Sequence, residues 1–162
     1  MLLSDSFTTQ HWIAILRIVV GLWWIKSVLH KEYPKFVRTG MMNWTNALLD
    51  NHPIPAFASA IRMIINASPI VFPYLIVLGE LAVGIGLTLG FLTPLAAIGA
   101  IFLNLNYLLT AGVKPKDISV NNCFRVEQGQ NIVMIGAELL FIGAGAWSAW
   151  SLDAALGLFP LS

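Results

Sequence analysis

Apolar residues are gathered into four long runs, each close to the length that crosses a lipid bilayer. About 20 such residues span the hydrocarbon core, and the runs cover residues 12–30, 70–90, 93–110 and 132–150. Residues 91–93 alone join the second and third runs, and Pro94 suits the first turn of a helix. The pattern predicts an all-α integral membrane protein in one domain, residues 1–162, whose antiparallel spans form a four-helix bundle.

The long first connection, residues 31–69, has a helical pattern of its own. One face carries apolar residues at helical spacing and the other carries polar ones: Phe36, Val37, Met41, Trp44 and Leu48 against Lys35, Arg38, Asn43 and Asn46. This pattern is typical of an amphipathic helix that lies flat at the membrane interface. The stretch NHPIPA ends it, and a more apolar helix over about 56–66 should follow and cap the end of the bundle.

Composition agrees with a membrane protein. The chain is 57% hydrophobic and 10% charged, whereas soluble domains are about 25% charged. A net charge of +1 and the lack of a basic run interleaved with aromatic residues give no sign of a nucleic-acid partner. The lone Cys123 cannot form an internal disulfide or a redox pair. The expected surroundings are the lipid bilayer.

The distribution of basic residues predicts the orientation. The two long connections lie on one side of the four spans and contain the Lys and Arg residues outside them: Lys31, Lys35, Arg38, Arg62, Lys114, Lys116 and Arg125. The two termini and the 91–93 turn, on the other side, contain none. For a bacterial inner membrane, the positive-inside rule therefore places the long connections on the cytoplasmic side and both termini on the periplasmic side.

Four charged residues fall within the runs. At 1.5 Å per residue, Arg17 lies about 8 Å below the side with the termini, Glu80 about 15 Å, Glu138 about 18 Å and Lys26 about 21 Å. A charge at such depth is costly and normally faces the bundle interior with a partner. We expect two buried ion pairs, Arg17–Glu80 and Lys26–Glu138, although Lys26 could instead reach the interface.

These groups have both a structural and a functional interpretation. Buried pairs fix which helix packs on which, yet intramembrane ionisable groups also mark ligand or proton sites. Asn104 could complete the Arg17–Glu80 cluster, and Arg17, Glu80, Asn104 and Tyr107 are the candidate ligand-binding residues. No catalytic motif is recognisable, so no catalytic residue is assigned. The three scattered histidines predict no metal site.

Three stretches carry a family resemblance: "ILRIVVGLWWIKSVLHK" (15–31), "GELAVGIGLTLGFLTPLAA" (79–97) and "GAGAWSAWSLDAALG" (143–157). Their order resembles the DoxX/DoxD family of small four-helix membrane proteins. Arg17 and Gly21 match the family's first helix, Glu80 matches its second, and residues 151–153, Ser-Leu-Asp, match the end of its fourth. The first connection is longer than in the shortest members, which favours the DoxD-like branch.

The resemblance implies a membrane subunit of a redox complex, since the family includes the small subunit of a thiosulfate:quinone oxidoreductase. A quinone would be the ligand, the chain would carry no redox cofactor of its own, and electrons would come from a partner. Whether the chain is itself an enzyme stays open at this point. The alternative is a non-catalytic scaffold subunit of a respiratory or photosynthetic assembly. A small transporter for a weak acid is a third hypothesis, for which four helices are few.

Overall fold

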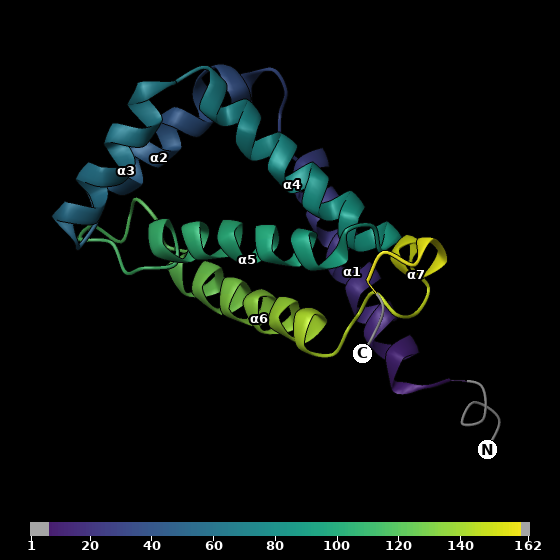
Figure 1. Ribbon diagram of the computed structural model, residues 1–162. Helices are drawn as coiled ribbons and strands as arrows, with labels where there is room; N and C mark the ends of the chain where they lie inside the picture. The colour runs from purple at the N-terminus through teal and green to yellow at the C-terminus, as the bar shows by residue number, and fades with distance from the viewer. Residues whose placement is uncertain (1–6, 160–162) are drawn as a thin grey trace.

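The computed structural model describes residues 7–159, and within that range the chain folds into seven α-helices and no strands (Figure 1). The helices are α1 (Thr9–Leu29), α2 (Met41–Asp50), α3 (Pro55–Ala67), α4 (Val71–Leu89), α5 (Thr93–Thr110), α6 (Phe124–Gly143) and α7 (Leu152–Leu156). A π-helical turn, Phe36–Gly40, leads directly into α2. The prediction of an all-α protein is confirmed.

Three helices have the length and apolar character of membrane spans: α1, α4 and α5. This supports the assignment of the chain to the membrane. Helix α6 is not among them because its first two turns are polar, with Arg125, Glu127, Gln128, Gln130 and Asn131.

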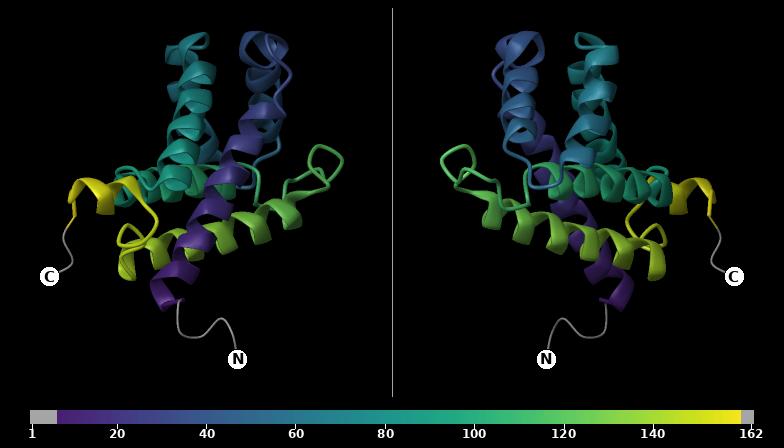
Figure 2. Two further views of the ribbon diagram at one scale, coloured as in Figure 1. Left: turned by 90° about the vertical axis from the view of Figure 1, so that its right-hand side faces the viewer. Right: turned by 90° about the vertical axis from the view of Figure 1, so that its left-hand side faces the viewer.

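The four longest helices contact one another in a ring. Helix α1 packs on α4, α4 on α5, α5 on α6, and α6 returns to α1. Figures 1 and 2 show α5 and α6 side by side and antiparallel, while α4 and α5 diverge from the short turn that joins them. Between these helices lies the main core, built around Trp24, Leu87, Ala97, Ala100 and Phe141.

Glycines set the close approach of α1 and α4. A Cβ added at Gly21 would lie 2.5 Å from the backbone nitrogen of Thr88, and one added at Gly84 would lie 2.8 Å from a side-chain carbon of Ile25. Small residues of this kind let helices pack backbone against backbone, as is common in membranes. The two helices can therefore keep this close contact only if both positions remain glycine.

Helices α2 and α3 form a hairpin across the open end between α4 and α5 (Figure 1). The hairpin has a small core of its own, in which Leu49, Ala58 and Ile65 are buried. It meets the second long connection, since the backbone N–H of Lys116 donates to the carbonyl of Asn51 at 2.8 Å. Both long connections thus gather at one end of the molecule, and the helices expected from the pattern of the first connection are present.

The opposite end holds the first turn of α1 and the last part of the chain. The side-chain amide of Gln10 donates to the carbonyl of Ala144 at 2.9 Å, and the ring of His11 packs on Trp150. The fourth run was expected to be helical over 132–150, which is wrong at both ends. Helix α6 begins eight residues earlier and ends at Gly143, because the next residues include Gly145 at φ +65° and Trp150 at φ +47°.

Candidate functional site

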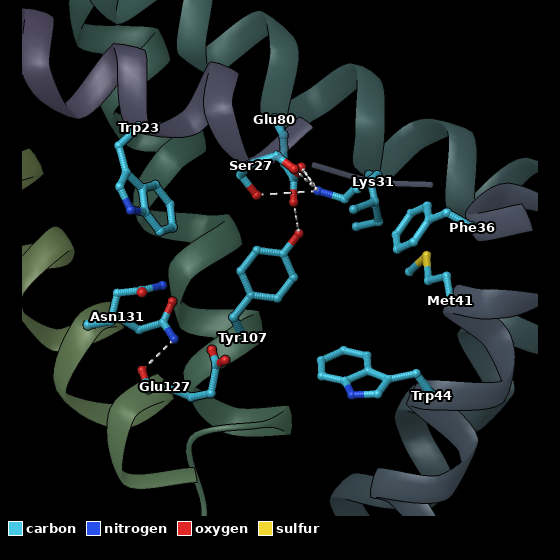
Figure 3. Close-up of a pocket in the computed structure, with 12 residues that line it drawn as sticks. Trp23, Ser27, Lys31, Phe36, Met41, Trp44, Glu80, Tyr107, Glu127 and Asn131 are labelled. Atoms are coloured by element: carbon cyan, nitrogen blue, oxygen red, sulfur yellow. Dashed lines mark hydrogen bonds and ion pairs between the residues drawn. The ribbon is translucent and has the colours of Figure 1, made fainter. Parts of the chain in front are cut away.

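Glu80 lies at the wall of a cavity of about 320 Å³ (Figure 3). Helix α4 presents its side chain to the interior, and only 2% of the residue is exposed. One carboxylate oxygen accepts a hydrogen bond from the Tyr107 hydroxyl of α5, and the other forms an ion pair with the ammonium group of Lys31. A buried carboxylate is therefore held by two donors from two other segments.

Lys31 lies two residues beyond the end of α1, and its side chain reaches back along the helix. Its ammonium group donates to the carbonyl and to the hydroxyl of Ser27, both at 3.3 Å, and lies 5.4 Å from the ring centroid of Phe36. The side chain is 13% exposed. Lys31 is thus fixed by Ser27, Phe36 and Glu80 and remains the member of the pair that lies closer to solvent.

Aromatic and polar side chains from five segments line the rest of this cavity, which we call the Glu80 cavity. Figure 3 shows Trp23 and Trp44 on two of its sides, with Tyr107 pointing to Glu80 between them. The lining residues are Trp23, Ser27, Lys31, Phe36, Met41, Trp44, Ile76, Glu80, Tyr107, Glu127, Gln130 and Asn131. Flat apolar walls with a few convergent polar groups are typical of small-molecule sites.

A second carboxylate lies deeper in the ring of helices. Glu138 of α6 is fully buried, and the side-chain amide of Asn104 donates to both of its oxygens, at 2.8 and 3.0 Å. The indole N–H of Trp24 donates to one of them at 3.3 Å. The expected pair with Lys26 is wrong: Lys26 is exposed, and Glu138 makes no ion pair within residues 7–159.

Arg17 lies beside the C-terminal end of α4. It is fully buried, and its guanidinium donates to the carbonyls of Leu87 at 2.7 Å, Trp150 at 2.7 Å and Ala149 at 3.4 Å. The expected Arg17–Glu80 pair is therefore wrong, because Arg17 meets the last turn of α4 at Leu87, whereas Glu80 lies at the middle of α4 and pairs with Lys31. Asn104 likewise joins Glu138 and not an Arg17–Glu80 cluster.

Asp153 explains the Ser-Leu-Asp motif. Its carboxylate accepts from the backbone N–H groups of Leu92 at 2.7 Å and Thr93 at 2.8 Å, at the start of α5. A carboxylate there accepts hydrogen bonds from the free N–H groups at the helix N-terminus, and its negative charge interacts favourably with the positive end of the helix dipole. Ser151 caps α7, since its hydroxyl accepts from the N–H of Ala154 at 3.0 Å. Together with Arg17, this motif forms a structural clasp around the α4–α5 turn.

Of the four candidate ligand residues, the structure brings together only Glu80 and Tyr107. Lys31, the walls formed by Trp23 and Trp44, and the polar groups of α6 were not recognised from the sequence. Lys31 could have been found, because Trp24, Ser27 and Lys31 recur at helical spacing along α1 and its continuation past Leu29. Outside the spans, desolvation raises the pKa of the Tyr33 hydroxyl, and the nearby charge of Glu80 raises it further.

Comparison with known proteins places the chain in a family. The model of the family described as "TQO small subunit DoxD" matches residues 12–157. The match includes both ends of the ring of helices, the Glu80 cavity and the clasp. No curated protein and no solved structure matches the chain.

Proposed function

Because the chain belongs to the DoxD family of small subunits, we propose that it is the membrane subunit of a thiosulfate:quinone oxidoreductase-like complex and that the Glu80 cavity holds the head group of a quinone. The observation that carries this proposal is the buried Glu80 carboxylate, held by Lys31 and Tyr107 at the wall of an aromatic-lined cavity. Electrons would come from thiosulfate through a partner subunit.

The polar groups of the cavity suit the chemistry of quinone reduction. A quinone that takes up two electrons must also take up two protons, one on each ring oxygen. The Tyr107 hydroxyl can turn from Glu80 to donate to such an oxygen, and the Lys31 ammonium group stabilises negative charge that develops there. Tyr107 is then reprotonated through Glu80, which takes up a proton from solvent at the loop end of the molecule and passes it on, the task of a general acid–base group.

The apolar walls suit the shape of the ligand. Trp23, Trp44 and Phe36 offer flat aromatic faces, and aromatic rings stack favourably in offset or edge-to-face geometry. The volume of about 320 Å³ lies at the lower end of the range of small-molecule pockets. Glu127, Gln130 and Asn131 add polar groups on the α6 side, where protons could enter from the loop end of the molecule.

In the membrane, the four long helices α1, α4, α5 and α6 would form an antiparallel spanning bundle. The basic residues of both long connections lie at the end where the α2–α3 hairpin meets the second connection. The positive-inside rule favours placing this end in the cytoplasm of a bacterial cell and both termini in the periplasm. Helix α2 would lie along the interface, with the Glu80 cavity near the cytoplasmic side.

A binding titration tests the quinone assignment. Purified protein in mild detergent is titrated with a water-soluble quinone analogue, and binding is followed by quenching of tryptophan fluorescence in a variant that keeps only Trp23 and Trp44. Tyr107→Phe should weaken binding about 10-fold or more, since a buried hydrogen bond to a polar ligand is worth about 1–2 kcal/mol. Tyr74→Phe is the matched control, because Tyr74 is 49% exposed and does not line the cavity.

The scaffold role remains the second candidate, and the fully buried clusters around Arg17 and Glu138 favour it. Neither cluster lines the Glu80 cavity, and both join helices through internal hydrogen bonds. A partner protein that co-purifies with the chain while no quinone binds would support the scaffold role. Unaltered quinone affinity in both Tyr107→Phe and Glu80→Gln would rule out the proposed head-group site.

A further inference from the structure

A second hollow, of about 170 Å³, adjoins the Glu80 cavity. It lies between the α2–α3 hairpin and helices α4 and α5. The two hollows share four wall residues: Met41, Trp44, Ile76 and Tyr107. In Figure 3, Trp44 and Met41 form one side of the Glu80 cavity, and through them it borders this hollow. A ligand that fills one space is therefore in contact with the wall of the other.

The chemistry of the second hollow differs from that of the first. Its remaining walls are mostly aliphatic or aromatic, with Ile61, Ile64 and Ile65 from α3 facing Phe102 and Leu103 from α5. Among the residues that the structure describes, no charged side chain lines it. We call it the apolar groove.

The apolar groove opens to the outside of the molecule. Ile64 is 55% exposed and Phe102 is 65% exposed, and both stand at its walls. Phe102 belongs to an apolar helix with the character of a membrane span. Large exposed apolar side chains on such a helix face lipid and not water. The groove thus connects the polar cavity with the hydrocarbon region.

We propose that the apolar groove holds the first isoprenoid units of the quinone whose head group occupies the Glu80 cavity. This inference rests on the proposed function. A membrane quinone has a polar ring joined directly to a branched hydrocarbon chain, so its site needs hydrogen-bond donors next to an apolar channel that leads to lipid. The shared walls at Trp44 and Tyr107 put these two environments side by side.

The groove gives the site a selectivity that the head-group contacts alone cannot supply. Burial of apolar surface on binding is favourable in proportion to the area removed from water, so each ordered isoprenoid unit adds affinity. A tail-less quinone would gain only the contacts of the Glu80 cavity. The protein would therefore prefer quinones carried in the membrane over soluble aromatic compounds with the same ring.

The test compares two quinones with the same ring, one without a side chain and one with several isoprenoid units. Ile64→Trp places a large ring in the groove, and Met63→Trp is the matched control, since Met63 is 72% exposed on the same helix and lines neither hollow. Each affinity is expressed relative to the unaltered protein in the same detergent, so that partition of the tail into micelles cancels.

Ile64→Trp should weaken binding of the prenylated quinone about 10-fold, or about 1.4 kcal/mol, and leave the tail-less quinone within about twofold. Met63→Trp should change neither. If Ile64→Trp lowers the thermal stability, Phe102→Ala replaces it, because truncation of this exposed ring removes the groove wall without opening the core. It should reduce the preference for the prenylated quinone.

Three outcomes overturn the inference. Equal effects of Ile64→Trp on both quinones, or no effect on either, would mean that the tail does not enter the groove. A phospholipid that co-purifies with the protein and is lost in Ile64→Trp, with quinone affinity unchanged, would make the groove a lipid site. If Phe102→Ala, like Ile64→Trp, leaves the ratio of the two affinities at its value in the unaltered protein, the head-group site stands and the tail site fails. If the unaltered protein binds neither quinone, the proposed function itself fails.

Discussion

The Lys31–Glu80 pair should show a strong coupling in a double-mutant cycle, and the two single changes should differ in the stability that they cost. Breaking a buried pair by removing one partner costs about 3–5 kcal/mol in soluble proteins, and interactions within membranes are generally weaker. Lys31→Met leaves the carboxylate of Glu80, 2% exposed, with Tyr107 as its one remaining donor among the described residues. We expect a loss of about 3 kcal/mol.

Glu80→Gln should cost less, about 1 kcal/mol. Lys31 keeps its two acceptors on Ser27, and its side chain, already 13% exposed, can turn outward at the end of α1, where a positive charge is favourable. The amide oxygen that replaces the carboxylate can still accept from Tyr107. The double variant should lose about 2 kcal/mol, so that the coupling is about 2 kcal/mol.

Thermal unfolding of the protein in mild detergent measures this cycle. For a chain of this length, 1 kcal/mol corresponds to about 2–4 °C in Tm, so the coupling should appear as about 4–8 °C. The control cycle pairs Glu80→Gln with Arg17→Gln, which should be additive because Arg17 donates to backbone carbonyls around the clasp. Strictly additive losses for Lys31 and Glu80 would refute the pairing described above.

Three further predictions concern stability and orientation. Asp153→Asn weakens the cap on two backbone amides at the start of α5 and removes the negative charge near the buried Arg17 guanidinium, so it should lower stability by about 1–3 kcal/mol, seen as a lower Tm. Gly21→Ala should lower Tm because the added Cβ collides with α4. Gly129→Ala is the control: a Cβ there meets no atom within 4 Å, so Tm should be unchanged or slightly higher. Equal effects of the two variants on Tm would argue against the close α1–α4 contact. A reporter inserted after Ile118 should be cytoplasmic and one fused after Ser162 periplasmic, and the reverse pattern would contradict the orientation.

The all-α fold class could be predicted from the sequence, because the length and apolar content of each run are local properties of the chain. The α4–α5 turn, with Pro94 in the first turn of α5, was also predictable. The ends of α6 were not. Its polar first turns look like a loop in a membrane protein, yet they are helical at the loop end of the molecule, and the backbone turns at Gly145 before the apolar run ends.

The burial of Glu80 in a paired state was anticipated, but its partner was not. Depth along a span depends only on residue number, which made Arg17 a reasonable choice. Pairing also depends on the rotation of each helix and on side-chain reach, which residue number does not contain. Lys31 was assigned to the connection because it follows the last apolar turn, yet its long side chain returns to Ser27 and Glu80.

The clasp has a consequence for the order of biosynthesis. Arg17 enters the membrane with α1, early in translation. Two of its three acceptors are the carbonyls of Ala149 and Trp150, which follow it by 132 and 133 positions in the chain. Until Ala149 and Trp150 emerge from the ribosome, its charge has no complete set of partners. We therefore expect helix α1 to stay in a partly hydrated position until then, at the insertion machinery or near the lipid head groups. The last part of the chain then acts as the latch that completes insertion of the first helix.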